Sequence, residues 1–370
     1  MHIGIIGAGI GGLTQSIALS LAGHDVEIFE KRHVLKQQGV GLGIGSNAMR
    51  ALSRYGIDKD ILAAGKVLRE CQFRTDRNTL LNTIQLSQGE YDNVTIQREQ
   101  LHDILRSYNQ ADIHLIKDVV HISDYEQPTM VFSDGTKYQF DLIIAADGLH
   151  SNIRRQMFKN SDAVYQGYTC FRGTSTGIQV EDAAIEYWGS DGRFGIVPLS
   201  DNEIYWFACM NAMERDNEFR YYNQHKLIEY FKAFPEAVTD TIAHTIHDPI
   251  HHDIYDINPL KTFSKGKVVL IGDAAHATTP NMGQGASLAI EDAISLAHQL
   301  EQLPIAQALA RFDKLSVQHT KRVIMKSRQI GKSAQLENKG LIKIRNKALK
   351  SIPAFMLNKQ IAFLNQRQIK

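Results

Sequence analysis

A glycine-rich turn near the start of the chain has the spacing of a dinucleotide-binding site. Gly7, Gly9 and Gly12 satisfy G-x-G-x-x-G between an apolar run and a helical pattern. The first glycine permits a tight turn, the second lets backbone approach a pyrophosphate, and the third allows close packing of helix on strand. Free N–H groups at the helix N-terminus would bind the phosphates. Glu30 could accept hydrogen bonds from ribose hydroxyls and would repel a 2′-phosphate, which favours FAD or NAD over NADP.

A second turn of this kind lies within residues 267–291. An apolar run ends at Asp273, and Pro280, Gly283 and Gly285 lie in a segment that opens a helix. The Asp273 carboxylate could bind the ribityl hydroxyls of a flavin, and the helix N-terminus could stabilise negative charge on the reduced ring. The glycines would let the backbone approach that ring. We therefore expect one FAD held at two places, with a helix N-cap as the alternative role of Asp273.

Apolar segments predict the parallel strands that carry these turns. Residues 2–6 and 25–30 flank a helical pattern over 13–21, which is the start of a βαβ unit. A third apolar strand is expected at 141–145, and the α/β pattern returns after residue 267. Further strands are expected at 113–121 and 130–132, and further helices at 46–54, 98–108 and 224–234.

Segments with β patterning interrupt the α/β pattern twice. They are residues 66–97 and 165–252, and a Ser-Asp-Asn hairpin turn is expected at 200–202. This order predicts an α/β fold in which a Rossmann-like FAD-binding domain is interleaved with a β-sheet substrate domain and followed by C-terminal helices. The expected boundaries are 1–70, 98–160 and 263–330 for the FAD-binding domain, 71–97 and 161–262 for the substrate domain, and 331–370 for a basic helical extension.

Three motifs together resemble the fingerprints of single-component (group A) FAD-dependent aromatic hydroxylases, which have the para-hydroxybenzoate hydroxylase fold. They are GAGIGG, DLIIAADGLHSNIRR and VVLIGDAAHATTPNMGQG, within residues 1–330. The resemblance implies an NAD(P)H- and FAD-dependent monooxygenase that acts through a flavin C4a-hydroperoxide. Its substrate would be a small planar aromatic, heteroaromatic or polyene compound, which it would hydroxylate or epoxidise. The alternatives are a flavin reductase or dehydrogenase acting on a quinone or isoprenoid, and a slow flavin-binding sensor.

The resemblance also implies roles for individual residues. Asp147 and Gly148 match a motif near the FAD pyrophosphate that is implicated in NAD(P)H use, and Arg154 or Arg155 is the matching basic position. An ordinary turn at a strand end is the alternative for Asp147. The expected cofactor-binding residues are Gly7, Gly9, Gly12, Glu30, Lys31, Gly41, Arg98, Asp147, Gly148, Asp273, Pro280, Gly283, Gly285 and Ala286.

Two further matches concern the flavin itself. Arg98 matches an arginine that contacts the cofactor, with a surface arginine as the alternative. Residues 41–45 match a glycine-rich loop that passes the flavin and allows its ring to swing, and we expect a loop over 38–45. His276, in the recurring GDAAH motif, is expected to be a packing or cofactor-adjacent histidine rather than a catalytic one.

Within the family, YQGYTCFRG, RFGIVPLS and GDAAHATTPNMGQG look closest to the urate hydroxylase and zeaxanthin epoxidase branch. By this resemblance Arg193 and Tyr205 match substrate-contacting positions. Arg193 could hold an anionic oxygen and Tyr205 could hydrogen-bond a ring carbonyl, with the hairpin surface and the sheet core as the alternative positions. The urate enzyme has an aspartate where this chain has Asn281, so we expect a planar aromatic or polyene substrate rather than urate.

Composition excludes other classes of protein. A net charge of +1 gives no overall field to attract nucleic acid. Cys71, Cys170 and Cys209 fit neither a disulfide framework nor a zinc site, and the histidines at 247–252 lack matching ligands, so no metal is expected. We expect neither a signal peptide nor a membrane-spanning run. We expect a cytoplasmic monomer or homodimer whose partners are a small aromatic substrate, NAD(P)H and O2.

The C-terminal segment is strongly basic. Residues 331–370 contain nine Lys or Arg and one Glu (Glu337), an excess of +8, so the rest of the chain sums to −7. We expect a helical extension with a solvated basic face. An alternative role of this segment is binding to anionic lipid, and a further one is binding to a protein partner or an acidic substrate. The apolar residues expected to dock the extension are Leu336, Leu341, Ile342 and Ile344.

Overall fold

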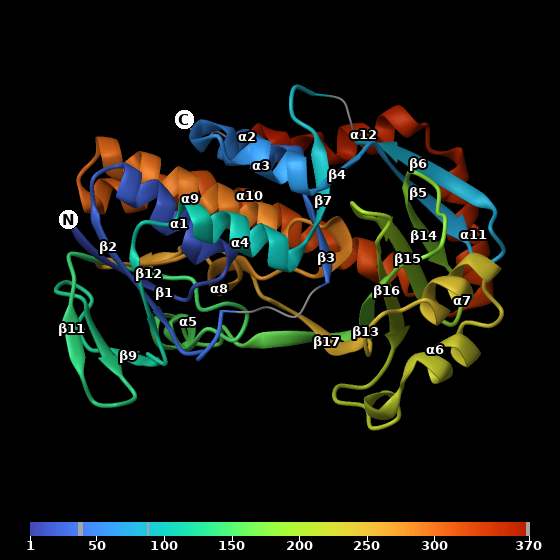
Figure 1. Cartoon of the computed structure of the whole chain (residues 1–370), viewed down its shortest axis with the longest axis horizontal. Helices are drawn as coiled ribbons and strands as arrows, with labels where there is room; N and C mark the ends of the chain where they lie inside the picture. The colour runs from blue at the N-terminus through green and yellow to red at the C-terminus, as the bar shows by residue number, and fades with distance from the viewer. Residues whose placement is uncertain (36–39, 87–88, 368–370) are drawn as a thin grey trace.

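The computed structural model describes residues 1–35, 40–86 and 89–367. A six-stranded sheet, parallel except for β18, lies at the centre of the nucleotide-binding half (Figure 1). Its central strands are apolar apart from His2 at the start of β1, because both faces of the sheet are covered. In sheet order the strands are β18 (Ser264–Lys265), β19 (Val268–Leu270), β12 (Leu142–Ala145), β1 (His2–Ile6), β2 (Asp25–Glu30) and β8 (Asp112–Leu115).

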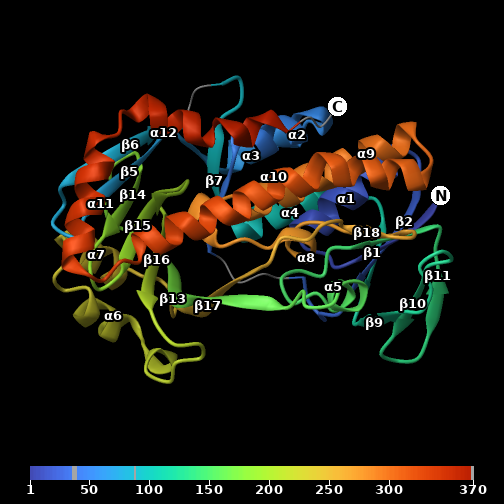
Figure 2. The ribbon, with the colours of Figure 1, turned by 180° about the vertical axis from the view of Figure 1, so that it is seen from behind.

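Helices cover this sheet and connect its strands. In Figures 1 and 2, α1, α4 and α9 run together along one side of the sheet, and β9–β11 form a small antiparallel sheet at the end of the molecule near the N-terminus. The helices are α1 (Ile10–Leu21), α4 (Arg98–Tyr108), α5 (Asn152–Met157), α8 (Asp273–His276) and α9 (Gly285–Gln302). The small sheet contains β9 (Val119–Ile122), β10 (Thr129–Phe132) and β11 (Lys137–Gln139).

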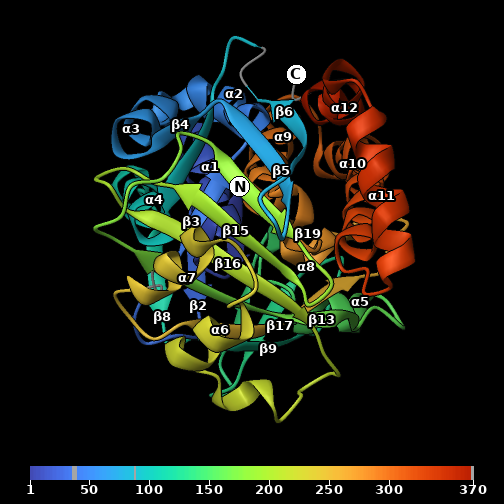
Figure 3. The same ribbon diagram turned by 90° about the vertical axis from the view of Figure 1, so that its right-hand side faces the viewer.

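A second large sheet, of seven strands, forms the other half of the molecule. One face packs an apolar core against α6 (Gln224–Tyr230) and α7 (Glu236–Ala243), and Figure 3 shows these two helices in front of the sheet. The expected 200–202 turn is confirmed, since Asp201 and Asn202 have φ of 57° and 58°, as a tight hairpin turn requires. In sheet order the strands are β17 (Ile250–Ile257), β13 (Ala163–Ser175), β16 (Ile204–Asn211), β15 (Arg193–Pro198), β14 (Ala184–Trp188), β5 (Glu70–Thr75) and β6 (Leu80–Gln85).

A three-stranded sheet lies between these halves. Its strands are β3 (Gly41–Ile44), β7 (Asn93–Gln97) and β4 (Lys66–Leu68), next to α2 (Ser46–Leu52) and α3 (Ile57–Ala64). The segment 71–97 is thus divided: β5 and β6 join the seven-stranded sheet, whereas β7 pairs with strands from 1–70.

The expected loop over 38–45 is partly wrong. Residues 36–39 lie outside the described residues, but Gly41–Ile44 is a strand paired with β7. A side chain at Gly41 would come within 2.4 Å of the Tyr205 Cβ atom. The glycine therefore permits close approach of the seven-stranded sheet, and glycine content alone does not indicate a loop.

Three helices complete the chain. They are α10 (Ile305–Ala334), α11 (Lys339–Ser351) and α12 (Ala354–Ile361), and Figure 2 shows α10 crossing from the nucleotide-binding half to the seven-stranded sheet. Residues 331–334 thus belong to α10. Short 3-10 turns, η1 to η4, occur at Ser53–Tyr55, Phe219–Tyr221, Pro280–Met282 and Ala362–Gln366. Within the part of the chain that the structure describes, no helix is long and apolar enough to cross a bilayer.

The docking predicted for the C-terminal extension is wrong for two of its residues. Leu341 and Ile344 are 51% and 68% exposed, and the buried residue of α11 is Arg345. Its guanidinium lies over the Trp188 ring at 5.1 Å and donates hydrogen bonds to the Ser333 and Ala334 carbonyls at the end of α10. The helix docks through a cation because these C-terminal carbonyls and the ring face both attract positive charge.

Other element predictions compare closely with the structure. The strands at 2–6 and 25–30 and the helix at 98–108 are confirmed with the expected bounds. The single strand expected over 113–121 is wrong, because Ile116 has a φ of 58° and separates β8 from β9. The α/β fold class, the separate β-rich part and the C-terminal helices are confirmed.

Candidate functional site

The first glycine turn has the geometry that its spacing predicts. Gly7 has a φ of 100°, and a side chain there would come within 2.6 Å of the Ala146 carbonyl oxygen. A Cβ at Gly12 would lie 1.9 Å from the Gly7 carbonyl oxygen, so the helix packs directly on the turn. Among the described residues, no atom beyond its chain neighbours lies within 4 Å of the Cβ position at Gly9. Space therefore opens at the N-terminus of α1, whose first N–H groups receive no side-chain cap.

Glu30 lies at the end of β2 beside this turn. Its carboxylate accepts hydrogen bonds from the backbone N–H groups of Ala8 and Arg32, both at 3.0 Å. These bonds fix the carboxylate and leave further lone pairs for ribose hydroxyls, while Lys31 is exposed next to it. A cavity of about 400 Å³ has as its first lining residue His33, which follows Glu30 by three residues. It is lined by His33, Val34, Leu35, Glu99, His102, Asp103, Arg106 and Leu115.

The second turn presents a carboxylate and an open helix end together. Asp273 is the first residue of α8 and is exposed, and it makes no N-cap bond. Its Oδ1 lies 3.8 Å from the Cβ position at Gly285, the first residue of α9. The first turn of α9 contains no acidic residue and no side-chain cap. Gly283 has a φ of 61°, and no other part of the described chain lies within 4 Å of its Cβ position. Pro280 is exposed and Ala286 half-buried beside it.

The Asp147–Gly148 turn leaves one buried acceptor open. Asp147 Oδ2 accepts a hydrogen bond from the Ile153 N–H at 3.5 Å, and Oδ1 has no partner among the described residues. Burial raises the pKa of this carboxyl. Gly148 has a φ of 82°, and its Cβ position meets none of the described residues within 4 Å. An unpaired buried oxygen is costly, so a ligand that donates a hydrogen bond would stabilise the turn.

The two candidate arginines of this motif differ. Arg154 is fully buried and donates hydrogen bonds to the backbone carbonyls of Leu149 and Ser161, at 2.6 and 2.7 Å. It also donates to the Ala274 carbonyl at 3.2 Å, which ties the Asp147 turn to α8. Arg155 is exposed. Arg154 is therefore a structural tie, and Arg155 is the one accessible to a soluble ligand.

Arg98 lies between the two halves of the proposed cofactor site. Burial lowers its pKa, and the nearby Asp273 carboxylate opposes that effect, while Arg172 and Arg32 add to it. Its backbone N–H donates to the Val40 carbonyl at 3.1 Å. The arginine is thus near the second turn and is not a surface residue.

These features fit FAD. The helix N-terminus at Gly9 offers free donors to a pyrophosphate, and the exposed Asp273 lies beside a second open helix end. The unpaired Asp147 Oδ1 marks a place where a ligand hydroxyl would complete the hydrogen bonding. A nicotinamide dinucleotide would leave the second turn without a ligand.

The seven-stranded sheet turns one face toward this site. Tyr205 of β16 belongs to that face, because it packs against Gly41 of β3. Residues that oppose each other on paired strands share a face, so register identifies the rest. The ligand face, as we name it, comprises Tyr168, Cys170, Arg172 and Thr174 of β13, Tyr205, Phe207 and Cys209 of β16, Arg193 of β15, Glu186 and Trp188 of β14, and Phe73 of β5.

Buried polar atoms without partners collect on the ligand face. They are Arg172 Nε, Thr174 Oγ1, Trp188 Nε1 and Arg193 Nε, none of which has a hydrogen-bond partner among the described residues. All four side chains lie within the register just given. Native proteins rarely leave such atoms unpaired. This face therefore has the properties of a surface that binds a ligand.

Arg193 is buried on the ligand face and its charge is compensated. It is 2% exposed, and its Nη1 donates to Glu186 Oε1 at 2.9 Å. Its Nη2 donates to Asn281 Oδ1, and the guanidinium lies over the Tyr168 ring at 5.5 Å. Burial lowers its pKa, but the charges of Cys209 and Glu186 outweigh burial and raise the pKa overall. The guanidinium therefore stays charged and paired.

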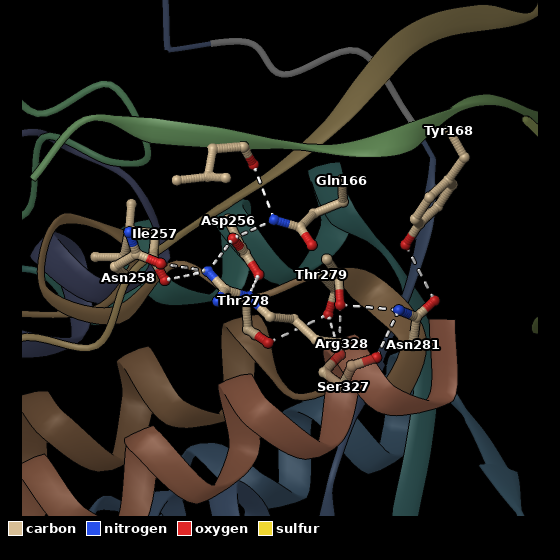
Figure 4. Close-up of polar contacts among 11 residues, drawn as sticks. Gln166, Tyr168, Asp256, Ile257, Asn258, Thr278, Thr279, Asn281, Ser327 and Arg328 are labelled. Atoms are coloured by element: carbon tan, nitrogen blue, oxygen red, sulfur yellow. Dashed lines mark hydrogen bonds and ion pairs between the residues drawn. The ribbon is translucent and has the colours of Figure 1, made fainter. Parts of the chain in front are cut away.

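Asn281 uses its whole hydrogen-bonding capacity, and Figure 4 shows its bonds to Tyr168, Thr279 and Ser327. Its Nδ2 donates to Thr279 Oγ1 at 2.8 Å and to the Ser327 carbonyl at 2.9 Å. Its Oδ1 accepts from the Tyr168 hydroxyl at 3.2 Å and from Arg193. A carboxylate here would face the Ser327 carbonyl oxygen without a donor between them. The amide is therefore the side chain that these surroundings require.

Figure 4 also shows the hydrogen bonds between α10 and β17. Arg328 donates to both carboxylate oxygens of Asp256, at 2.5 and 2.7 Å, and Asp256 is fully buried. Gln166 donates to Asp256 Oδ1 at 2.8 Å. These bonds hold the helix against the strand at the edge of the ligand face.

Tyr205 and His276 have separate environments. Tyr205 is half-buried and hydrogen-bonded to Arg172, and burial raises its pKa. The buried His276 lies 2.5 Å from Asp292 Oδ2, which also accepts from the Gly272 N–H at 2.9 Å. Arg367 donates to Asp292 Oδ1 at 2.6 Å. His276 thus stabilises the second turn through Asp292, and Arg367 also holds Asp292 in place.

Sequence reasoning missed several residues of the ligand face, including Glu186, Tyr168, Arg172 and Phe207. The signal for Tyr168, Arg172 and Phe207 is the alternation of β13 and β16, which places every second residue of YTCFRG and IYWFACM on one side. The cysteines are free, and Cys170 opposes Cys209 in the register.

Comparison with known proteins identifies relatives along nearly the whole chain. The family model described as FAD binding domain matches residues 1–310. The chain is 34% identical over 358 residues to aurachin C monooxygenase/isomerase of Stigmatella aurantiaca, covering 94% of this chain and 93% of that protein. It is 29% identical over 365 residues to 2-heptyl-3-hydroxy-4(1H)-quinolone synthase of Pseudomonas aeruginosa, covering 95% and 94%. Chloroplastic zeaxanthin epoxidase of Prunus armeniaca is 31% identical over 326 residues, which span 82% of this chain and 49% of that protein.

Solved structures with the same fold carry flavin and aromatic ligands. HpxO of Klebsiella pneumoniae, complexed with FAD and uric acid, has a TM-score of 0.89 at 24% identity, covering 99% of this chain and 97% of that one. A salicylate hydroxylase substrate complex has a TM-score of 0.83 at 22% identity, covering 100% and 96%. At these identities the likeness concerns the fold.

Proposed function

The chain belongs to the FAD-binding family of group A flavin monooxygenases and is an FAD-dependent monooxygenase, and we propose that its substrate is a neutral, planar heteroaromatic compound of the alkylquinolone kind. NAD(P)H as the reductant is typical of the family. The observation that carries the substrate class is the pairing of Arg193 with Glu186. Because the arginine charge is already compensated, the ligand face holds no free cation at this position for an anionic substrate.

The hydrogen bonds that remain open suit a neutral ring. Arg193 Nη1 and Nη2 each donate one hydrogen bond, to Glu186 and Asn281, and its Nε–H belongs to the guanidinium nitrogen that has no partner among the described residues. We assign this N–H to a ring carbonyl or hydroxyl oxygen of the substrate. Phe207 and Phe73 share the ligand face and would contact the flat faces of the ring.

The relatives support this class over an anionic one. Two relatives that match along nearly the whole chain are named for aurachin C and for a quinolone with a heptyl chain. The urate and salicylate complexes match at under 25% identity. Asn281 adds to the argument, since its surroundings require an amide at the position where the resemblance to the urate enzyme implies a carboxylate.

The chain's own groups would hold the cofactor at both turns. When bound and reduced, FAD supplies the activation of O2 for oxygen transfer. Asp273 would hold the ribityl chain, Glu30 the adenosine ribose, and the open N-terminus of α9 the pyrimidine end of the ring. The exposed Arg155 would meet NAD(P)H. Cytoplasmic location and a monomer or homodimer remain predictions.

A substrate panel tests the proposal. FAD-loaded protein would be mixed with NADPH or NADH and O2, together with 2-heptyl-4-quinolone, urate, salicylate or zeaxanthin. We expect the quinolone to stimulate nicotinamide oxidation most and to yield a product heavier by one oxygen atom in mass spectrometry. Stimulation by urate or salicylate equal to that by the quinolone would contradict the proposed class. Turnover that continues without O2 on another acceptor would indicate a reductase.

A further inference from the structure

Helices α11 and α12 present large apolar side chains to solvent. Leu341 and Ile344 are 51% and 68% exposed, and Phe355 and Met356 are 70% and 48% exposed. Lys343, Lys347 and Lys350 are exposed on α11 as well. We name these seven side chains the C-terminal surface.

Helical spacing places the two kinds of side chain of α11 on one outward side. Lys343, Lys347 and Lys350 follow one another at intervals of four and three residues and so form a stripe. Ile344 follows Leu341 by three residues and lies beside that stripe. The inward side is formed by the buried Arg345 and its half-buried neighbours. The outward side is therefore half basic and half apolar.

The charge around this surface is of one sign. Residues 331–370 carry an excess of +8, and no acidic residue follows Glu337. Two of the cations, Arg345 and Arg367, are buried in contacts described above, so the surface charge is chiefly lysine. The rest of the chain sums to −7. The molecule is thus polarised, with α11 and α12 at its positive side.

We propose that the C-terminal surface binds the face of an anionic lipid bilayer. Lysines next to exposed leucine, isoleucine and phenylalanine side chains are the composition of helices that lie in the membrane interface. The lysines would contact lipid phosphates, and the apolar side chains would enter the headgroup region. Figure 3 shows α11 and α12 on the outside of the molecule, where a flat surface would reach both. This inference does not depend on the proposed substrate class.

Sedimentation with vesicles tests the proposal. Full-length, FAD-loaded protein would be mixed with vesicles of phosphatidylcholine alone or with phosphatidylglycerol added. We expect binding to the anionic vesicles and little to the neutral ones. Replacing Lys343, Lys347 and Lys350 by Gln should weaken partitioning on the order of 100-fold, since each lysine near such a surface contributes about fivefold. Ile344→Gln with Phe355→Gln should weaken it roughly tenfold or more.

A matched control separates this surface from general charge. Lys59, Lys137 and Lys314 are exposed lysines of other elements, and their replacement by Gln removes the same charge. Flavin content and thermal midpoint would confirm that all variants are folded. Absence of binding to anionic vesicles, or equal loss in the control, would overturn the proposal. So would a change of oligomeric state in the Ile344 and Phe355 variant with vesicle binding intact, since that would identify a second copy as the occupant.

Discussion

The two faces of the seven-stranded sheet are built from the same strands but differ in kind. Toward α6 and α7, alternate residues of β15 and β16, among them Phe194 and Trp206, form a closed apolar core. The one indole N–H in that core, of Trp206, donates to Thr245 Oγ1 at 3.1 Å. On the ligand face the same strands carry Arg193, Cys209 and other polar groups, with four buried atoms unpaired among the described residues.

The contrast separates the residues of one sheet into those that pack the core and those that would bind a ligand. The apolar face is stabilised by the folded chain alone, because α6, α7 and nearby residues such as Phe219 and Phe234 pack against it. The polar groups of the ligand face are buried away from water. Their burial lowers the stability of the folded protein unless a ligand forms hydrogen bonds with them. Folding therefore depends mainly on the first face and substrate recognition on the second.

The largest expected effect is on the packed face. Trp206 is fully buried and its ring stacks on Phe194 at 5.5 Å, so Trp206→Ala should lower the free energy of unfolding by about 4 kcal/mol. Urea unfolding followed by circular dichroism measures this. The flavin-loaded protein that remains folded should keep its substrate preference, and an altered preference would break the comparison.

Arg193→Gln should cost about 3 kcal/mol of stability, because it leaves the Glu186 carboxylate buried without its cation. The matched variant Arg193→Gln with Glu186→Gln should regain most of that loss. Neither variant should regain full substrate-stimulated NADPH oxidation, since the Nε–H assigned to the substrate is missing in both. Full activity of the double variant would show that Arg193 serves packing alone.

Cys209 should make stability depend on pH. Burial raises its pKa, but the Cys170 hydrogen bond and the Arg193 charge outweigh burial and lower it from 9.0 to about 7. A lowered folded-state pKa stabilises the protein above the unfolded value, and this stabilisation is lost as pH falls from 9 through 7. Wild type should thus gain on the order of 2 kcal/mol between pH 7 and 9 relative to Cys209→Ser. If the free energies of unfolding of wild type and Cys209→Ser in urea changed with pH in parallel, the folded protein would not favour the Cys209 thiolate.

Phe207→Ala should have the smallest effect on stability, about 1 kcal/mol, because the ring is half-buried on the ligand face. The same change should raise KM for the substrate, since a flat contact with the ring is lost. Steady-state NADPH oxidation and urea unfolding on the same preparation measure both. A stability loss as large as that of Trp206→Ala would erase the difference between the faces.

The sequence predicts what depends on neighbours along the chain. Gly7, Gly9 and Gly12 are identified by spacing, because a tight turn and a helix start are local features. Arg193 could be proposed as a site residue, but its partner Glu186 could not, since only strand register brings β14 beside β15. Gly41 led to the wrong prediction of a loop, because a glycine is needed there for the close contact with Tyr205, which is far away in sequence.

The C-terminal segment shows the same limit. Its charge was evident from composition, and its docking was not. Arg345 reaches Trp188 and Arg367 reaches Asp292, contacts that join residues 157 and 75 positions apart. Helical periodicity favoured Leu341 and Ile344 for docking, but the carbonyls at the end of α10 select a cation instead.

The chain contains two tryptophans, one on each face, and they provide the most direct test of the central claim. Trp188 Nε1 is unpaired on the ligand face, and Trp206 lies in the packed core. Fluorine NMR of the FAD-loaded protein labelled with 5-fluorotryptophan, with Trp188→Phe to assign the signals, would be followed while adding the compound that most stimulates NADPH oxidation. We predict that the Trp188 signal shifts and the Trp206 signal does not. A shift of Trp206 alone, or of both equally, would contradict the assignment of the two faces.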